Sequence, residues 1–365
     1  MYEQIREDTL FCMLYASAAM LSLTACCYLL FRRGNAFAPD ITTPLRLRRW
    51  TAAFFASATL SHVWYLPIAF LTSSEDMILS YLIGTLLDCI ILVPSAIAIL
   101  FTLLQDRRRP LWPVGVMIAP LAVIHVLCIA NHSVALLPLV RIYLLLLGIA
   151  LTIYMIRAVR QYGRWLRNNY ADLEHKEVWQ SFMVLAIILL VFGIYTVADW
   201  GPIYQYVLQL NDIVLICYLL WRVETLSDLS VPIQSECATE EVKDNVLALA
   251  VNNNIETLLK QHCEDSKLYL QHDISVSQLA KLIGTNRVYL SKYFAMQGVT
   301  YNTYINGLRI KHFIKLYHER LATHQPIIAK QLAFQSGFRS YSTFGTAFKQ
   351  TMGMTATEWM RSIAE

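Results

Sequence analysis

The fold of the C-terminal part is decided by residues 275–294, which read Ser275-Val-Ser-Gln-Leu-Ala-Lys-Leu-Ile-Gly-Thr-Asn-Arg-Val-Tyr-Leu-Ser-Lys-Tyr-Phe294. Ser275 and Gln278 have the spacing of a capping box, so a helix is predicted to begin here. Gly284 is predicted to end that helix in a tight turn, and Asn286 can cap a second helix. Together these features predict a helix-turn-helix.

The same pattern returns in residues 326–349, which lie 54 positions further on when Asn286 is matched to Ser340. Pro326 suits the start of a helix, Gly337 suits the turn, and Ser340 suits the cap of the second helix. The side chains expected to form the core of this unit are Ile328, Leu332, Ala333, Phe344 and Phe348. The chain is therefore predicted to carry two helix-turn-helix units in tandem.

A long helix, about Tyr301 to Leu321, is predicted to join the two units. At roughly 1.5 Å per residue it would span about 30 Å. That length is close to one turn of DNA, about 34 Å, so both second helices could enter successive major grooves. Residues 270–365 also hold eleven Lys and Arg against four Asp and Glu, a net charge of +7. A basic surface of this kind favours binding to phosphates.

Residues 270–361 resemble the AraC/XylS-type transcription regulators. The positions that carry the resemblance are Leu279-Ala280, Tyr289-Leu290-Ser291, Phe294, Gly298, Tyr304-Ile305, Leu308-Arg309-Ile310, Gly337-Phe338, Ser342, Phe344, Phe348-Lys349 and Gly353-Met-Thr-Ala-Thr-Glu-Trp-Met-Arg361. The whole chain is similar to membrane-anchored members of that family, in which a multispan N-terminal region replaces a soluble effector domain. Ala356 departs from the family, which usually has proline there, but Thr355 and Glu358 still form a capping box.

The resemblance and the helical spacing together imply which side chains face DNA. The expected DNA-binding residues are Arg287, Val288, Ser291, Lys292, Arg339, Tyr341, Ser342, Thr346 and Lys349. Lys292 can reach guanine and Val288 a thymine methyl group, whereas Arg339 and Lys349 are expected on phosphates. Gly345 offers no side chain to a base, so the second unit is expected to contact the DNA backbone more than it distinguishes bases.

The N-terminal part has a different composition. Of the 365 residues, 56% are AVILMFWYC and 15% are charged, and no lysine precedes Lys176. A soluble domain has about 45–50% apolar residues even when glycine is included. Seven apolar runs are long enough to cross a bilayer, which takes roughly 17–25 helical residues. They are Leu10 to Phe31, Thr51 to Leu71, Ile78 to Leu104, Leu111 to Ala130, Ala135 to Ile156, Ser181 to Ala198 and Ile203 to Trp221, the last of which is the weakest.

The basic residues predict the orientation of these runs, because basic connections stay on the cytoplasmic side. Residues 32–50, 105–110 and 157–180 hold five, three and five Lys and Arg, whereas the alternate connections hold none. We therefore predict a multi-pass protein of the bacterial cytoplasmic (inner) membrane, with the N-terminus outside and the C-terminal domain in the cytoplasm. The predicted domains are 1–221 as a transmembrane sensor, 222–269 as a helical linker and 270–365 as the DNA-binding domain.

Several polar groups lie in the apolar runs or at their ends, where ionisable side chains are costly and usually paired or functional. They are His62, Asp88, His125, Arg141, Asp199, Asn211 and Asp212. One interpretation is a structural salt-bridge network, for example Arg141 with Asp88 or Asp212. The other is a signal site open to the outer face, formed by His62, Asp88, His125, Arg141 and Asp212. No spacing typical of a metal site is present, and no metal or cofactor is predicted.

The linker has a helical pattern from about Glu240 to Cys263. Two interpretations stay open: a helix that packs on its own domain, or a connector through which two chains form a homodimer.

The predicted fold class is all-α, a seven-span transmembrane bundle followed by a cytoplasmic double helix-turn-helix domain. The seventh run has no lysine for a retinal Schiff base, and the chain has no GxSxG, HExxH, Walker or GxGxxG motif, so no enzyme is predicted. The predicted function is a one-component transcription regulator whose partners are double-stranded promoter DNA, the lipid bilayer and an unknown signal ligand or membrane partner. The alternative is a membrane interaction protein whose helical module docks another protein.

Overall fold

The helices of the chain divide into two units. The computed structural model describes residues 8–32, 35–39, 41–197, 201–229 and 255–364. Within these ranges there is no strand, only one isolated bridge between Tyr170 and Ser275. Unit 1 comprises Met1–Tyr162 with Val178–Val231, and unit 2 comprises Gly163–Glu177 with Pro232–Glu365. The all-α prediction is confirmed for the described residues.

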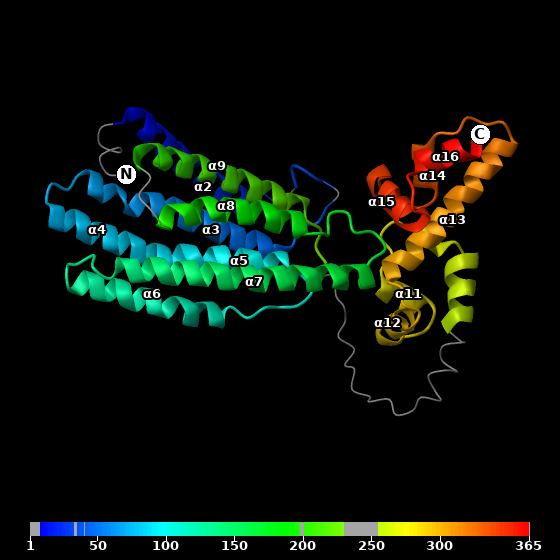
Figure 1. The fold of residues 1–365 in the computed structure, drawn as a ribbon, viewed down its shortest axis with the longest axis horizontal. Helices are drawn as coiled ribbons and strands as arrows, with labels where there is room; N and C mark the ends of the chain where they lie inside the picture. Colours follow the sequence, from blue (N-terminus) through cyan, green and yellow to red (C-terminus); the bar gives the residue numbers. More distant parts are fainter. Residues whose placement is uncertain (1–7, 33–34, 40, 198–200, 230–254, 365) are drawn as a thin grey trace, which may run out of the picture. The chain divides into compact units, whose positions relative to one another are not determined.

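Unit 1 is a bundle of long apolar helices that lie side by side in Figure 1. The helices are α2 (Thr9–Phe31), α3 (Leu45–Trp64), η1 (Leu66–Ala69), α4 (Ser74–Leu87), η2 (Asp88–Leu92), α5 (Val93–Leu103), α6 (Trp112–Ala130), α7 (Leu137–Asn169), α8 (Trp179–Val197) and α9 (Gly201–Thr225). Helix α2 packs on α3 and α9, α3 packs on α5, and α4 packs on α6. The last turns of α7 belong to unit 2.

Local chemistry accounts for the bounds of these helices. Asp8 caps α2, because its side chain accepts from the backbone N–H groups of Leu10 and Phe11, each at 3.1 Å. Helices α4 and α5 are joined by η2, a wider π-helical turn that ends two residues before Pro94. Proline lacks a backbone N–H, so we attribute the wider turn to the hydrogen bond that Pro94 cannot donate.

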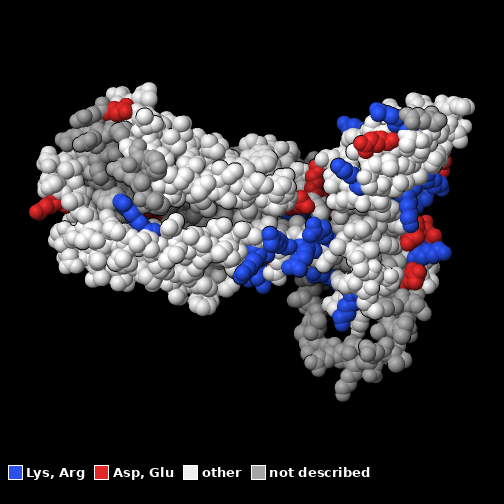
Figure 2. All heavy atoms as spheres, in the orientation of Figure 1, with Lys and Arg blue, Asp and Glu red and all other residues white. Residues whose placement is uncertain are grey.

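The outer faces of unit 1 are apolar. Phe70, Ile203 and Phe31 are 83%, 80% and 79% exposed, and many Leu, Ile and Val side chains beside them are also exposed. Figure 2 shows the visible face of unit 1 covered mostly by uncharged atoms, whereas unit 2 carries many charged side chains. Apolar surface of this extent is typical of contact with lipid or with a protein partner.

Among the described residues, six helical segments, not the seven predicted, are long and apolar enough to cross a membrane. They are Thr9–Phe31, Leu45–Ala69, Ser74–Leu103, Trp112–Ala130, Leu137–Asn169 and Ile203–Thr225. The predicted sixth span, Ser181 to Ala198, falls in α8, whose described apolar stretch is the shorter Trp179–Ile194. The polar last run, expected to be the weakest, is among the six, and Ala198 and Asp199 lie outside the described residues.

Unit 2 contains η3 (Lys260–Asp265), η4 (Leu268–Leu270), α11 (Val276–Leu282), α12 (Arg287–Met296), α13 (Tyr301–Ala322), α14 (Ala329–Gln335), α15 (Tyr341–Met352) and α16 (Ala356–Ala364). It has two apolar cores. One surrounds α11 and α12 and includes Leu279, Leu290 and Phe294. The other surrounds α14 and α15 and includes Phe313 and Phe344. Helix α13 contributes side chains to both cores and so joins the two parts.

The linker prediction is tested only in part, because residues 230–254 lie outside the described ranges. Residues 255–259 are helical and continue into η3. Their side chains Ile255 and Leu259, followed by Cys263, are buried in the first core of unit 2. This part of the linker packs on its own domain, which was the simpler of the two interpretations.

Candidate functional site

The first helix-turn-helix unit forms as its sequence predicts. The Ser275 Oγ accepts from the Gln278 N–H at 3.3 Å, and the Gln278 Oε1 accepts from the Ser275 N–H at 2.8 Å, which completes the capping box of α11. Gly284 has a φ of +72° and makes the turn. Asn286 caps α12, because its side chain accepts from the Val288 N–H at 2.7 Å.

The second unit has the predicted turn and cap, but its first helix begins later. Helix α14 begins at Ala329 rather than at Pro326, and Ile328, which was expected in the core, is 48% exposed. Ile328 has an extended backbone and acts as the helix N-cap, so its side chain does not lie on the buried face. Ser340 caps α15 through the Thr343 N–H at 3.2 Å. Leu332, Ala333, Phe344 and Phe348 are buried as predicted.

A buried arginine fixes the segment that precedes α11. Arg309, in α13, is 1% exposed. Its Nε donates to the Tyr269 carbonyl at 2.8 Å, and one Nη donates to the Gln271 carbonyl at 2.7 Å. Charged hydrogen bonds of this kind are stronger than neutral ones. They hold residues 269–272 against α13, beside Gly337, whose carbonyl oxygen lies 3.1 Å from the His272 Nδ1.

The side chains predicted to face DNA lie mostly on the outward faces of α12 and α15. On α12, Val288 and Lys292 are exposed, while Arg287 and Ser291 are half-buried. On α15, four predicted residues line one shallow hollow together with Gly345 and Gln350; the four are Tyr341, Ser342, Thr346 and Lys349. Sequence reasoning missed Gln350, although it is four residues after Thr346 and so lies on the same helix face. A glutamine there can bond adenine.

Arg339, expected on a phosphate, is held by an acidic side chain in this structure. Its Nη1 lies 3.2 Å from the Asp273 Oδ2, and the Asp273 Oδ1 pairs with the Lys176 Nζ at 3.0 Å. Burial raises the pKa of Asp273, but Lys176 and Arg339 lower it more, so the net shift of the pKa is downward. The Asp273 carboxylate is therefore negatively charged at neutral pH.

The polar groups of unit 1 form one cluster that contains three of the five predicted signal-site residues. The His62 Nε2 lies 3.3 Å from the Gln209 Oε1. Asp88 accepts from the Ser61 hydroxyl at 2.8 Å and from a second hydroxyl, on Tyr65, at 2.7 Å. Asp212 interacts electrostatically with both His62 and Asp88. The cluster thus joins α3, η2 and α9. Gln209 was missed, although it is three residues before Asp212.

The other two predicted signal-site residues do not join this cluster. The His125 Nδ1 lies 2.8 Å from the Leu121 carbonyl of its own helix. Arg141 is exposed, and the ion pairs among the described residues include none between Arg141 and Asp88 or Asp212. In the described part of the chain, no group of three or more His, Cys, Asp and Glu is arranged to hold a metal.

Comparison with known proteins assigns the C-terminal domain. A family described as "Helix-turn-helix domain" matches residues 279–362. These residues form an AraC-type helix-turn-helix domain. The TCP pilus virulence regulatory protein of Vibrio cholerae is 41% identical over 76 residues, which is 21% of this chain and 26% of that protein. The HTH-type transcriptional activator RhaR of Salmonella typhi is 29% identical over 75 residues, which is 20% of this chain and 25% of the relative.

A third relative, an uncharacterized HTH-type transcriptional regulator of Staphylococcus aureus, is 30% identical over 102 residues, or 28% of this chain and 13% of that protein. The chain thus spans about a quarter or less of the length of these relatives. No solved structure matches the chain. All three relatives are named as regulatory proteins, and an AraC-type helix-turn-helix domain implies that this domain binds DNA.

Proposed function

We propose that the chain is a membrane-embedded, one-component transcription regulator that couples a signal at unit 1 to promoter binding by unit 2. The supporting observation is that one chain contains both an AraC-type helix-turn-helix domain and six long apolar helices. We propose 1–221 as the sensor, 222–269 as the connector and 270–365 as the DNA-binding domain. The bilayer would cover the apolar outer faces, and a homodimer would suit two-fold symmetric promoter sites.

The start of the connector is fastened to two of the basic connections of unit 1. The Asp228 N–H donates to the Thr42 carbonyl at 2.8 Å. Gln105 accepts from the Leu229 N–H at 2.8 Å and donates to the Ser227 carbonyl at 3.0 Å. A rearrangement of the helices that carry these connections would therefore move the first residues of the connector.

The polar cluster of His62, Asp88 and Asp212 is our proposed signal site. Its groups come from three helical segments, so a ligand or a proton that binds there would change how those segments pack. Substituting Asp212 with Asn should change promoter activity in response to the signal without changing the affinity of unit 2 for DNA. A variant with an unaltered response would argue for a purely structural cluster.

The nine predicted DNA-facing residues of α12, α15 and the turn before α15 support binding to a promoter duplex. Because phosphate contacts release counterions, affinity for duplex DNA should fall steeply as salt rises. The alternative function, docking of a protein partner, predicts little dependence of DNA affinity on salt. Measuring DNA binding of the full-length protein in lipid nanodiscs over a salt series distinguishes the two.

The proposed location is the bacterial inner membrane, with the three basic connections and the C-terminal domain in the cytoplasm and the N-terminus outside. Reporter fusions that are active on only one side of the membrane test this. An N-terminal reporter should be active outside and a C-terminal reporter inside. Six complete crossings would place both ends in the cytoplasm, and an N-terminal reporter active inside would contradict the proposed orientation.

A further inference from the structure

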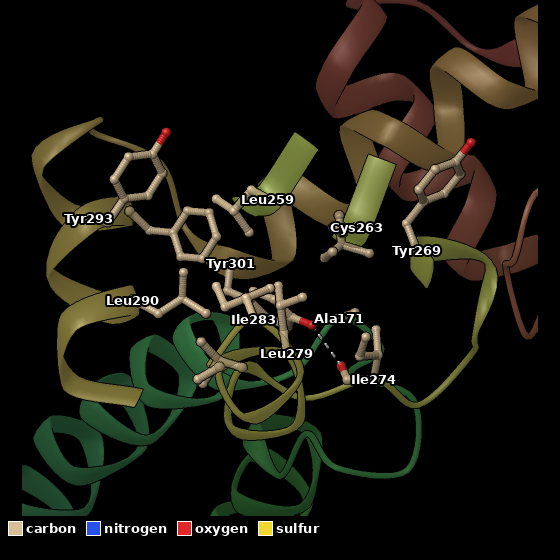
Figure 3. Packing of buried hydrophobic residues seen from close by; sticks show 14 of the residues in the cluster. Ala171, Leu259, Cys263, Tyr269, Ile274, Leu279, Ile283, Leu290, Tyr293 and Tyr301 are labelled. Atoms are coloured by element: carbon tan, nitrogen blue, oxygen red, sulfur yellow. Dashed lines mark hydrogen bonds between the residues drawn. The ribbon is translucent and has the colours of Figure 1, made fainter. Parts of the chain in front are cut away.

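Residues 170–177, in the connection between α7 and α8, pack within unit 2. We call these residues the α7–α8 loop. Although both helices contribute to unit 1, this loop belongs to unit 2. Ala171 is fully buried in the first core of unit 2, where it packs with Ile274 and Leu279 (Figure 3).

Backbone hydrogen bonds hold the loop at the first residues of two helices. The Ala171 N–H donates to the Ile274 carbonyl at 3.3 Å, drawn as a dashed line in Figure 3, and Tyr170 bridges Ser275, the N-cap of α11. The Asn302 Nδ2 donates to the Ala171 carbonyl at 2.6 Å, at the start of α13. The loop thus contacts the residues at which α11 and α13 begin.

The charged side chains of the loop reach the second helix-turn-helix unit. Lys176, whose side chain is 6% exposed, shares the Asp273 carboxylate with Arg339. The Glu174 Oε2 accepts from the Thr343 hydroxyl at 3.4 Å, in the first turn of α15. Arg339 and Ser342, expected to contact DNA, are therefore close neighbours of residues that the loop contacts.

The docked loop is incompatible in charge with a bound duplex. Phosphates are expected at the positive N-terminal end of α15 and at Arg339. Glu174 places a carboxylate at that helix end, and Arg339 is already paired with Asp273. Like charges brought together at an interface weaken binding. A docked loop therefore opposes DNA binding.

The docked loop also buries one carboxylate oxygen unfavourably, which lowers the free energy needed to release the loop. Asp172 is 2% exposed, and its Oδ2 has no hydrogen-bond partner among the described residues. Burying a polar oxygen without a partner is unfavourable, so the contacts of the loop are partly offset. Because the loop directly follows α7 and precedes α8, a movement of these helices would pull on it.

We propose that the α7–α8 loop is an autoinhibitory clasp, which holds the AraC-type domain in a state of low DNA affinity until unit 1 releases it. This inference rests on the proposed function, since it assumes that unit 2 binds DNA and that unit 1 changes in response to a signal.

Two substitutions release the clasp by different routes. Glu174→Gln removes the carboxylate beside α15 and keeps the shape of the side chain. Ala171→Arg places a long charged side chain where the present methyl group is fully buried, so the loop cannot dock. Asn168→Ala is the matched control, because Asn168 is exposed at the end of α7, two residues before the loop.

The experiment measures the affinity of full-length protein in lipid nanodiscs for a fluorescent duplex selected by the protein from random-sequence DNA, in the absence of signal. Both release variants should bind at least about fivefold more tightly than wild type, the low end of ordinary coupling between sites. Asn168→Ala should bind as wild type does.

Unchanged or weaker binding by Glu174→Gln would overturn the clasp while leaving the proposed function intact. Glu174→Gln carries this test on its own if Ala171→Arg disturbs folding, which hydrogen exchange of α13 reports. If neither wild type nor the released variants bind duplex DNA, the proposed function fails and the clasp fails with it.

Discussion

At the scale of single residues, Lys292 is the side chain best placed to read a base. It is exposed on α12, on the face that also carries Val288. A lysine bonded to guanine contributes about 1–3 kcal/mol of discrimination between bases. We therefore expect Lys292→Ala to weaken binding to a selected duplex by roughly 5- to 150-fold and to random duplex much less. Competition binding measures both, and equal losses would make Lys292 a phosphate contact.

Two features of position 337 exclude any residue other than glycine: its positive φ and the close approach of Leu270. Its φ is +89°, and a Cβ there would lie 2.7 Å from the Leu270 Cα. Gly298 also has a positive φ, +68°, but a Cβ there would meet nothing within 4 Å. Gly298→Ala should cost about 1 kcal/mol in the free energy of unfolding of unit 2, and Gly337→Ala about 2–3 kcal/mol. Hydrogen exchange of α13 in the full chain measures this, and equal costs would contradict the close approach to Leu270.

His312 makes the stability of unit 2 depend on pH. Burial lowers the pKa of His312 below its ordinary value, and the charges of Lys267 and Lys315 lower it further, against the opposing effect of Glu319. Because the pKa of His312 is lower in the folded than in the unfolded state, the unfolded state binds a proton more readily as the pH falls. Unit 2 therefore has its full stability with respect to His312 above about pH 6.5, and loses stability as the pH falls toward the folded pKa. Hydrogen exchange of the α13 amides should become faster as the pH falls below about 6.5, and the increase should be smaller in His312→Gln. An identical pH profile in both proteins would exclude His312 as the cause.

At the scale of elements, α15 contains a glycine that its packing does not need. A Cβ at Gly345 would meet nothing within 4 Å, and Gly345 lines the outward hollow of α15. Because glycine lowers helix stability, Gly345→Ala should stabilise α15 by up to about 1 kcal/mol while the preferred DNA sequence stays the same. Exchange of α15 and selection from random DNA measure the two effects. A large loss of DNA binding would instead show that the backbone at Gly345 approaches DNA closely.

Short-range signals explain which elements could be predicted. The caps at Ser275, Asn286 and Ser340 act within three residues, and all three form as their sequences predict. The start of α14 could not be read correctly, because Pro326 and Ile328 fit a helical pattern and only the surrounding fold makes the backbone at Ile328 extended. For unit 1, composition predicted the long apolar helices, six of which are found among the described residues.

At the scale of the whole molecule, the features missed by the sequence are contacts between distant segments. In one of the two interpretations Arg141 would pair with Asp88 or Asp212, whereas the helices bring both aspartates near His62. Likewise, Ala171 gives no local sign that it fills the core of a domain that begins about a hundred residues later. Such pairings depend on how helices pack, which periodicity does not specify.

We propose that this chain binds promoters through its AraC-type domain while unit 1 lies in the membrane. Crosslinking and immunoprecipitation of the tagged full-length protein, in its own membrane, tests it across the genome. We predict a few sharp peaks that share a sequence motif, and their loss or marked weakening in Lys292→Ala. The absence of peaks from protein shown to be intact and inserted, for wild type and for Glu174→Gln alike, would contradict the account.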